Sequence, residues 1–447
     1  MSLLGSSGFR GIFGQDLTPD IVVKICWAFA SLDKNSVVIG WDTRLTSPLL
    51  ALHAAVGVIS AKSVAKLAGL MPTPALAYVS KRADAGIMIT ASHNPPEYNG
   101  VKLFNPDTSS LTPEQYQVVE QRLSHPLSFD WKELKHVDFS NDLLEDYKTA
   151  LLKERTLLPK PIAIDPGGGA MCKIAANALK QLGATVHAIN DEPDGLFKAR
   201  SSEPSPEALQ LLSEYVRGNS LYCGFAFDGD GDRVVVVDEK GTYVPPDSLI
   251  AAYASYVIKK SSNKVVVVNL DTSYCVDKAV EEAGGSVVRT KVGDVFIAEK
   301  LKQVKGVFGA EPCGAWIHPD FSLCPDGLLS TIRLLSALDE LDVSMSEFVS
   351  RYKPGIMLRE KVRCENKLKK AAMEKITSRL EDMDYVKKET IDGVWMRFKD
   401  YSWLLVRPSG TEPYIRVTVE AGDSERANSL LRNAMEIVRT AVEAYKA

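Results

Sequence analysis

The stretch Pro161-Ile-Ala-Ile-Asp165 is a short apolar run that ends in an aspartate, and the chain contains two more of this kind. They read Val37-Val-Ile-Gly-Trp-Asp42 and Lys264-Val-Val-Val-Val-Asn-Leu-Asp271. Each is followed by a helical stretch, a second apolar run and a third. The second runs lie near 66–71, 184–190 and 286–290, and the third at 86–90, 223–227 and 306–309. Apolar runs without alternation, separated by helices such as 174–182 and 275–283, predict parallel or mixed sheets buried on both faces.

The pattern changes near residue 355, where strands and helices no longer alternate in this way. Strands are expected at 355–362, 394–398, 403–407 and 414–420, with helices at 367–380 and 424–444. A chain of 447 residues is long enough for two to four domains. We therefore predict three similar α/β domains with mixed or parallel sheets and a C-terminal α+β domain. The predicted ranges are 1–154, 155–250, 251–352 and 353–447.

The composition is typical of a globular protein. Hydrophobic residues make up 45% and charged residues 25%, which argues against disorder. The 53 basic and 57 acidic side chains leave a net charge of −4, whereas nucleic-acid-binding proteins normally carry a basic excess. Membrane-spanning and signal-peptide patterns are absent from the sequence, and the 7 cysteines are scattered without a C-x-x-C pair. We expect a cytoplasmic protein with reduced thiols and with neither a membrane nor a nucleic acid as partner.

A polar loop follows each of the third apolar runs. The loops are Ala91-Ser-His-Asn-Pro-Pro96, Asp228-Gly-Asp-Gly-Asp-Arg233 and Ala310-Glu-Pro-Cys-Gly314. In open α/β sheets, ligands bind beyond the carboxyl ends of the strands. Any α/β protein has such loops, but three equivalent loops rich in reactive side chains favour a shared active site. We expect the three similar domains to contribute one loop each to a central cleft.

The loop 228–233 carries a predicted metal site. Asp228, Asp230 and Asp232 alternate with glycine, which permits a bend that turns the carboxylates toward one point. Hard oxygen ligands suit Mg²⁺ or Ca²⁺, and like charges crowded without a cation would be unfavourable. An EF-hand is excluded because its sixth position, a glycine in that motif, is Arg233 in this chain.

Ser92 is the candidate reactive hydroxyl, and it lies next to His93. A serine beside a histidine suggests a hydrolase, but adjacent residues rarely form a triad hydrogen bond and the loop is not a G-x-S-x-G elbow. The alternative is a hydroxyl that carries a phosphoryl group, with the metal loop neutralising its charge. Lys102 would supply positive charge, or act as a base if its neighbours depress its pKa.

Two further loops offer phosphate ligands. Arg407-Pro-Ser-Gly-Thr-Glu-Pro413 combines a guanidinium, two hydroxyls and backbone N–H groups around a glycine, and Arg416 follows on the next predicted strand. Near the start, Gly5-Ser-Ser-Gly-Phe-Arg-Gly11 carries Arg10, which would hold a second phosphate. In the third polar loop, Glu311 and Cys313 are suited to sugar hydroxyls.

Together these segments resemble the α-D-phosphohexomutases. The motifs Gly-Ser-Ser-Gly-Phe-Arg-Gly, Thr-Ala-Ser-His-Asn-Pro, Asp-Gly-Asp-Gly-Asp-Arg and Arg-Pro-Ser-Gly-Thr-Glu-Pro occur in the family's order. The family's four-domain architecture would cover essentially the whole chain. The resemblance implies an isomerase that interconverts hexose 6-phosphate and hexose 1-phosphate through a phosphoserine and a bisphosphate intermediate. It also implies one Mg²⁺ per chain and a hexose 1,6-bisphosphate as activator.

The resemblance further implies a role for each motif residue. Ser92 would be the phosphoserine, and the Mg²⁺ ligands would be Ser92 through its phosphoryl oxygen, Asp228, Asp230 and Asp232. Surrounding the reacting centre would be Arg10, His93, Arg233 and Lys102, with Lys102 the favoured proton acceptor. The phosphate that is not reacting would be bound by Arg407, Ser409, Gly410, Thr411 and Arg416.

Two segments bear on the sugar. The family's recognition loop is often Gly-Glu-x-Ser-Gly-His, whereas Ala310-Glu-Pro-Cys-Gly-Ala315 keeps Glu311, places Cys313 at the serine and lacks the histidine. Upstream, Thr290-Lys-Val-Gly-Asp294 resembles the branch that acts on glucosamine phosphate, where a carboxylate at Asp294 would favour an ammonium on C2. The expected reaction is therefore glucosamine 6-phosphate to glucosamine 1-phosphate, and the alternative is a phosphomannomutase/phosphoglucomutase.

Two other classes remain open. A Mg²⁺-dependent sugar-phosphate phosphatase would use the same metal and phosphate sites but would transfer the phosphoryl group to water. A non-catalytic sugar-phosphate sensor would bind without turnover, although it would need neither Ser92 nor the three aspartates. In each case the expected partner is a small sugar phosphate, and we expect a monomer or a homodimer.

Overall fold

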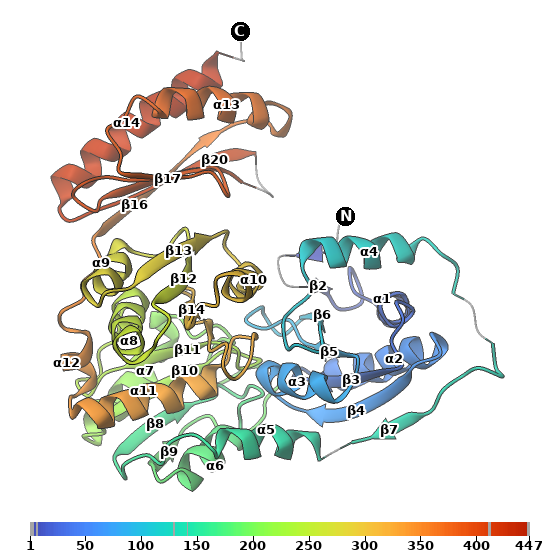
Figure 1. Ribbon diagram of the computed structural model, residues 1–447. Coiled ribbons are helices and arrows are strands. Elements are labelled where there is room, and N and C mark those ends of the chain that lie inside the picture. Colours follow the sequence, from blue (N-terminus) through green and yellow to red (C-terminus); the bar gives the residue numbers. More distant parts are fainter. Residues whose placement is uncertain (1–3, 6–7, 128–129, 141, 410–412, 445–447) are drawn as a thin grey trace. The chain divides into compact units, whose positions relative to one another are not determined.

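The computed structural model describes residues 4–5, 8–127, 130–140, 142–409 and 413–444, whose helices and strands are drawn in Figure 1. The chain divides into two compact units. The first unit comprises residues 1–246 and 293–349, and the second comprises residues 247–292 and 350–447.

The N-terminal part of the first unit is built on a seven-stranded sheet in the order β1-β2-β6-β5-β3-β4-β7. β3 runs parallel to β4 and β5, and β4 runs parallel to β7. β6 is antiparallel to both β5 and β2. The strands are β1 (Leu4–Gly5), β2 (Gly8–Ile12), β3 (Ser36–Trp41), β4 (Val64–Leu70), β5 (Ala85–Ile89), β6 (Tyr98–Phe104) and β7 (Val137–Phe139).

Helices bury the apolar faces of this sheet. α1 contributes Trp27 and Phe29, and α2 contributes Leu50, to a core that includes Val37 and Ile39 of β3. Apolar burial of this kind is the main favourable term in folding, at about 25 cal/mol per Å². The helices are α1 (Pro19–Ala30), α2 (Ser47–Ser60), α3 (Thr73–Val79), α4 (Pro113–Leu123), α5 (Leu143–Leu151) and the short 3₁₀ helix η1 (Ser80–Arg82).

A second sheet of the first unit has the order β11-β10-β8-β9. β8 (Pro161–Asp165) lies parallel to β9 (Thr185–Ala188) and to β10 (Cys223–Phe227), and β11 (Val234–Val237) is antiparallel to β10. Its helices are α6 (Ile174–Gln181), η2 (Pro206–Leu209) and α7 (Gln210–Gly218). The first unit is completed by α10 (Asp294–Val304), β14 (Phe308–Ala310), β15 (Trp316–Ile317), α11 (Gly327–Leu341) and α12 (Met345–Val349).

The second unit joins a short α/β segment to a five-stranded antiparallel sheet in the order β16-β20-β19-β18-β17. The segment contains α8 (Pro246–Lys260), β12 (Val265–Asn269), α9 (Tyr274–Glu282) and β13 (Ser286–Thr290), with β12 and β13 parallel. The sheet contains β16 (Ile356–Arg363), β17 (Lys387–Glu389), β18 (Val394–Arg397), β19 (Trp403–Pro408) and β20 (Tyr414–Ala421). Its helices are η3 (Asn366–Leu368), α13 (Lys369–Leu380) and α14 (Ser424–Glu443).

The two faces of the five-stranded sheet pack against different parts of the second unit. α13 and α14 lie over one face (Figure 1), where Leu404 and Val406 of β19 belong to the core. Because side chains alternate along a strand, Trp403 and Leu405 point to the other face, where they cluster with Leu270 beyond β12. This second cluster joins the C-terminal sheet to the α/β segment of the same unit.

Most of the elements predicted from the sequence are confirmed. The first apolar runs form β3, β8 and β12, the second form β4, β9 and β13, and the third form β5, β10 and β14. β5 and β10 each pair with a following antiparallel strand, as does β14, so the sheets are mixed rather than purely parallel. The sequence missed β17 because Lys387-Lys-Glu389 contains no apolar residue. The four domain ranges stay a prediction.

The described helices include none with the length and apolar character that a membrane crossing requires.

Candidate active site

Ser92 lies in the loop between β5 and β6, beyond the carboxyl end of β5. The residue is only 1% exposed, and its backbone φ of 51° is left-handed, which costs a non-glycine residue about 1–2 kcal/mol. Its N–H donates to Thr90 Oγ1 at 2.9 Å, and its Oγ donates to Asp228 Oδ2 at 2.8 Å. The structure thus brings the predicted reactive hydroxyl into contact with the predicted metal loop.

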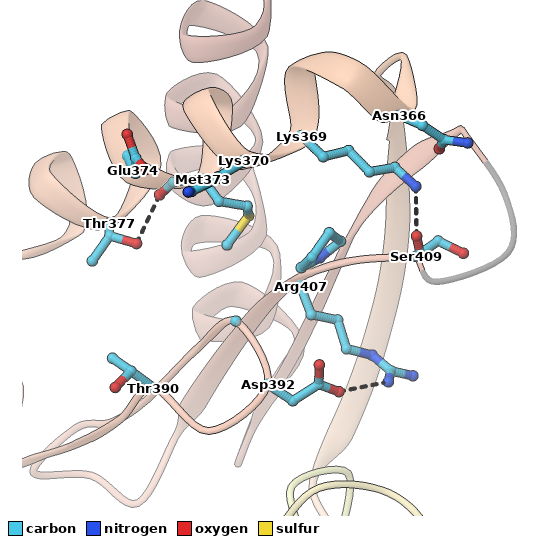
Figure 2. A pocket seen from close by; sticks show the side chains of 12 residues that line it. Asn366, Lys369, Lys370, Met373, Glu374, Thr377, Thr390, Asp392, Arg407 and Ser409 are labelled. Atoms are coloured by element: carbon cyan, nitrogen blue, oxygen red, sulfur yellow. Dashed lines mark hydrogen bonds and ion pairs between the residues drawn. The ribbon is translucent and has the colours of Figure 1, made fainter. Parts of the chain in front are cut away.

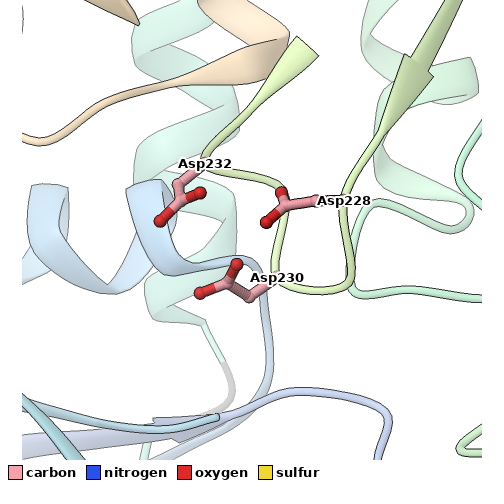
Figure 3. A group of neighbouring side chains, drawn as sticks. All are labelled: Asp228, Asp230 and Asp232. Atoms are coloured by element: carbon pink, nitrogen blue, oxygen red, sulfur yellow. The ribbon is translucent and has the colours of Figure 1, made fainter. Parts of the chain in front are cut away.

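The three aspartates of that loop turn their carboxylates toward one another (Figure 3). Asp228, Asp230 and Asp232 each offer an oxygen within 4.8 Å of the others, in the turn between β10 and β11. Gly231 has a φ of 76°, which an L side chain rarely adopts. At Gly229 an added Cβ would lie 2.6 Å from the Ser92 carbonyl oxygen. The two glycines therefore allow both the bend and the close approach of the Ser92 loop.

The donor set fits a divalent cation. Asp230 Oδ1 and Asp232 Oδ1 are buried and accept no hydrogen bond from the described residues. Burial, together with the other two carboxylates, raises the pKa of Asp228 well above its ordinary value. Buried carboxylate oxygens that are crowded and incompletely satisfied favour a hard cation such as Mg²⁺. Thr73 orients one member, because its Oγ1 donates to Asp230 Oδ2 at 2.5 Å and its N–H donates to the Asp230 carbonyl at 2.8 Å.

Lys102 projects from β6 into the same cluster. Its Nζ lies 2.7 Å from Asp230 Oδ2 and 2.8 Å from Asp232 Oδ2, and the residue is 5% exposed. Burial opposes the charged form, but the two carboxylates hold the pKa of Lys102 above its ordinary value. The Lys102 ammonium therefore lies directly beside the carboxylates of the metal loop, and its role as a proton acceptor stays a prediction.

Arg10 contacts the Ser92 loop, and His93 lies beside the Ser92 hydroxyl. Arg10 extends from β2 and donates to Asn94 Oδ1 at 3.0 Å, in the same loop as Ser92. His93 Nδ1 lies 3.4 Å from Ser92 Oγ. Burial, with Arg233 and Arg10 nearby, lowers the pKa of His93 to about 3, so its imidazole is neutral near pH 7.

Arg233 connects the metal loop to the third polar loop. Its guanidinium lies 3.3 Å from Glu203, and its backbone forms a β-bridge with Ala315. Glu311, in this third loop, is 5% exposed and accepts from the Gly293 N–H at 2.8 Å. Cys313 of the same loop is exposed. The structure therefore places the predicted sugar-recognition loop directly beside the metal loop.

Asp294 is the first residue of α10, one position after Gly293. Its Oδ2 accepts from Ser110 Oγ at 3.4 Å. Burial raises the pKa of Asp294, while Lys102 acts in the opposite direction. Asp294 is thus within electrostatic range of the Lys102 cluster.

The second unit holds the remaining predicted phosphate ligands. Arg407 lies at the end of β19, directly opposite Arg416 of β20. Like charges in such a pair repel. Two carboxylates offset this repulsion, because Arg407 Nη1 lies 3.1 Å from Asp392 Oδ2 and its Nη2 lies 3.7 Å from Asp271 Oδ2. Gly410 and Thr411 lie outside the described residues.

A pocket of about 1220 Å³ opens beside Arg407 (Figure 2). Lys369 reaches across from α13 and donates to the Ser409 carbonyl at 2.5 Å, which orders the start of the predicted phosphate loop. Arg407 lines this pocket, and its side chain is 24% exposed. The pocket is lined by Asn366, Lys369, Lys370, Met373, Glu374, Thr377, Thr390, Asp392, Gly393, Arg407, Pro408 and Ser409.

With this geometry in place, comparison with known proteins identifies the family. The phosphoglucomutase/phosphomannomutase α/β/α domains I, II and III match residues 1–127, 138–241 and 245–354, and the C-terminal domain of that family matches residues 360–437. The chain belongs to the phosphoglucomutase/phosphomannomutase family. The third repeat, which is divided between the two units, corresponds to the family's domain III.

Relatives in the family match over almost the whole chain. A phosphoglucosamine mutase of Methanococcus vannielii is 36% identical over 99% of this chain and 100% of its own length. One of Methanocaldococcus jannaschii is 35% identical over 99% of both chains. A solved phosphoglucomutase/phosphomannomutase family protein from Burkholderia thailandensis superposes with a TM-score of 0.88 at 24% identity, over 98% of this chain and 97% of that one. The four-domain α/β architecture and the family resemblance predicted from the four motifs are confirmed.

Several residues at the site of this family member were missed by sequence analysis. Thr73, Glu203 and Asp392 contact the predicted residues from segments without a recognisable motif. Lys369 is one of many lysines in an amphipathic helix. Asp271 did carry a signal, because it is one of the aspartates that end the first apolar runs, but its proximity to Arg407 could not be read from the sequence.

Proposed function

We propose that the protein is a phosphohexomutase that interconverts hexose 6-phosphate and hexose 1-phosphate through a phosphorylated Ser92. The observation that carries this proposal is the 2.8 Å contact between Ser92 Oγ and Asp228, beside two more carboxylates and the Lys102 ammonium. A buried hydroxyl at the edge of a cation site is suited to carry a phosphoryl group. The family membership of the whole chain supports the same chemistry.

The reaction takes place in two transfers. In the first, the P–O bond of phospho-Ser92 breaks and a new P–O bond forms to the free hydroxyl of the sugar monophosphate, with net transfer of that hydroxyl's proton to Ser92 Oγ. The bisphosphate then turns over, the P–O bond at its other phosphate breaks, and this phosphoryl group is returned to Ser92 Oγ, with net transfer of the Ser92 proton to the sugar oxygen. Catalysis of such transfers depends on positioning and on charge stabilisation. In this chain Arg10, Lys102 and Arg233 provide that charge.

Asp228, Asp230 and Asp232 would hold one Mg²⁺ together with a phosphoryl oxygen on Ser92. When bound, the cation would neutralise charge on the phosphoryl group that is transferred. The chain's own residues keep these ligands in place through Thr73 and the glycines of the loop. We also propose a hexose 1,6-bisphosphate as activator, because it would phosphorylate Ser92 directly.

The second phosphate of the substrate would bind at Arg407, Ser409, Gly410 and Thr411, with Arg416 adjacent. The described part of this site supports the assignment, because Arg407 lines an open pocket and its guanidinium contacts Asp392, another lining residue (Figure 2). A guanidinium is suited to bidentate phosphate contacts.

We propose glucosamine 6-phosphate as the preferred sugar. Two relatives that match over almost the whole chain at 35–36% identity are phosphoglucosamine mutases. Asp294, near the Lys102 cluster, would favour an ammonium group on C2, and Glu311 and Cys313 would contact sugar hydroxyls. We further propose that the protein acts in the cytoplasm, as a monomer or homodimer without nucleic acid or membrane partners.

A turnover comparison tests the proposal. The purified protein, with Mg²⁺ and a trace of glucose 1,6-bisphosphate, receives the 6-phosphates of glucosamine, mannose and glucose, and the products are followed by phosphorus NMR. We expect glucosamine 1-phosphate to form with the highest kcat/KM. Comparable rates on mannose and glucose phosphates would identify a phosphomannomutase/phosphoglucomutase instead. Stoichiometric release of inorganic phosphate would identify a phosphatase, and binding without turnover would identify a sensor.

A further inference from the structure

A buried arginine donates hydrogen bonds to several backbone carbonyls of the Ser92 loop. Arg44 is 0% exposed and lies two residues after Asp42, the aspartate that ends the first apolar run. Its Nε donates to Asp42 Oδ2 at 3.0 Å. Its Nη1 donates to the carbonyls of residues 95 and 98 at 2.5 and 3.1 Å, and its Nη2 donates to those of residues 92 and 94 at 2.8 and 2.7 Å. All five guanidinium N–H groups therefore have acceptors, three of them in the loop and one at the first residue of β6.

A second buried arginine donates hydrogen bonds to the backbone at the start of the metal loop. Arg200 is 8% exposed, and its Nε donates to Asp165 Oδ2 at 3.0 Å. Its Nη2 donates to the carbonyls of Asp165 and Phe227 at 2.9 and 2.6 Å. Phe227 is the residue immediately before Asp228. Asp165 is again the aspartate that ends a first apolar run.

A third buried arginine lies in the second unit. Arg289 of β13 is 1% exposed, and its Nη2 donates to Asp277. Its Nη1 donates to the carbonyls of residues 269, 270 and 272 at 3.1, 3.3 and 2.8 Å. These carbonyls flank Asp271, which lies 3.7 Å from Arg407. In this case the paired carboxylate comes from α9, which leaves Asp271 available to Arg407.

We propose that Arg44, Arg200 and Arg289 are positioning residues, and that each sets the backbone of one loop that serves the reaction. The loops are those of Ser92, Asp228 and Asp271. This inference rests on the proposed function for the identity of the reaction. The three arginines come from different places in their repeats, namely after the first strand, after the second strand and within the second strand. The three arginines therefore do not occupy equivalent positions, although each donates hydrogen bonds to the backbone carbonyls of a buried loop.

A buried loop has no neighbouring strand or helix turn whose N–H groups could donate to its backbone carbonyls, and these carbonyls are also shielded from water. An unpaired buried carbonyl is unfavourable, and a guanidinium offers five donors in a rigid planar fork. At the Ser92 loop the need is greatest, because Ser92 itself has a left-handed φ of 51°. Asp42 neutralises the buried charge and also accepts from Thr90 Oγ1 at 2.7 Å, the hydroxyl that accepts the Ser92 N–H.

The decisive test is the Arg44→Lys variant. Lysine keeps the charge near Asp42 but has three donors on one nitrogen and cannot span four carbonyls. We expect phosphoryl transfer from glucose 1,6-bisphosphate to Ser92, followed by rapid quench and mass spectrometry, to slow by about 100-fold, since a displacement of order 1 Å has an effect of this size. The Kd for glucosamine 6-phosphate should change by less than about threefold, because the phosphate pocket is untouched.

Arg333→Lys is the matched control. Arg333 lies in the same unit and pairs with Glu154 and Asp320, but it donates to no carbonyl of the Ser92 loop in the described structure. We expect it to lower the melting temperature without slowing transfer in the folded protein. Thr90→Val and Thr90→Ser form a second pair, in which only serine keeps the hydroxyl. Valine should slow transfer by about tenfold, and serine should restore most of the rate.

Hydrogen exchange separates this proposal from the proposed function. In Arg44→Lys, amides of residues 90–98 should exchange faster, while those of β3 and β10 keep their wild-type rates. The role of Arg44 would be overturned if Arg44→Lys transferred phosphate and exchanged its amides at wild-type rates. It would also be overturned if Arg44→Lys slowed phosphoryl transfer no more than Arg333→Lys does. If the wild-type protein does not transfer phosphate to Ser92 at all, the proposed function fails, and the exchange measurement still decides whether Arg44 holds the loop.

The other two arginines have distinct expected readouts. Arg200→Lys should weaken Mg²⁺ binding, measured by calorimetry, by about tenfold, because Asp228 follows the carbonyl that Arg200 holds. Arg289→Lys should leave Mg²⁺ binding unchanged and lower KM for the sugar phosphate by up to a few fold, because a displaced Asp271 competes less with the phosphate for Arg407. If Arg200→Lys and Arg289→Lys changed Mg²⁺ affinity and KM in the same way, the assignment of one loop to each arginine would be overturned.

Discussion

The region around Ser92 and the region around Arg407 both carry charged side chains, but their surroundings differ. Ser92 is 1% exposed and Asp228 is 0% exposed, and buried arginines hold the backbone on both sides. Arg407 has a side chain that is 24% exposed, borders a pocket of about 1220 Å³ and pairs with two carboxylates. The first region is buried and its backbone is held by hydrogen bonds, whereas the second is more exposed and its arginine is paired with carboxylates, which we expect a bound phosphate to displace.

This difference has a physical consequence. Electrostatic interactions are stronger where water is excluded, and fixed groups require no reorganisation when charge moves. At an accessible arginine, solvent and salt weaken each contact, so the site contributes affinity more than rate. We therefore expect substitutions in the Ser92 region to lower kcat and substitutions in the Arg407 region to raise KM.

The largest effect should follow Ser92→Ala. Removing the phosphoryl carrier should lower kcat by at least about 10⁴-fold, with little change in the Kd for glucosamine 6-phosphate by calorimetry. Ser220→Ala is a matched control, because Ser220 has the same φ of 51° in an exposed turn after α7. Substantial mutase activity in Ser92→Ala would refute the phosphoserine role.

Loss of the metal should come next. Dialysis against EDTA should abolish turnover, and Mg²⁺ should restore it. Asp232→Asn removes one charge from the cluster and should weaken Mg²⁺ binding, measured by calorimetry, by at least about tenfold. Asp238→Asn is the control, since Asp238 is buried in the turn that follows β11 and accepts from the N–H groups of Lys240 and Thr242. Equal Mg²⁺ affinity in the two variants would contradict the assigned ligands.

A smaller effect, on binding, is expected for Arg407→Ala. Charge-assisted hydrogen bonds contribute about 1.5–3 kcal/mol each, so KM should rise by roughly 10- to 100-fold while kcat changes little. The rise should be accompanied by a weaker dependence of KM on salt. Arg397→Ala serves as control, because Arg397 lies on the neighbouring strand β18 and pairs with Glu281. An unchanged KM in Arg407→Ala would remove the phosphate role from this site.

The smallest effect is expected at Asp392, which competes for Arg407. A partly exposed ion pair is worth about 0.2–1 kcal/mol, so Asp392→Asn should lower KM by up to about fivefold. Asp400→Asn, which removes a carboxylate paired with Arg426, should have no such effect. A higher KM in Asp392→Asn would show that Asp392 orients Arg407 and does not compete with the phosphate.

Local patterns of the sequence predicted most of the fold. Apolar runs such as 223–227 and the helical spacing of 275–283 specify strands and helices through contacts between near neighbours, and the structure confirms both. The alternation of aspartate and glycine at 228–232 likewise predicted converging carboxylates, because a tight turn determines its own side-chain directions. The polar strand Lys387–Glu389 was missed because it forms by pairing with β18 and not by an apolar pattern.

The chain's linear order thus determined most of the strands and the four motifs, and it predicted the reactive serine and the acidic ligands, since each depends on residues close in sequence. The folded arrangement was needed to find that Lys102 is paired with Asp230, 128 residues away, and that its pKa is raised. It was also needed to find that Arg44 holds the carbonyls of a loop about 50 residues further on. Such contacts depend on how strands distant in sequence come together, and the energy of a buried charge is set by everything that surrounds it.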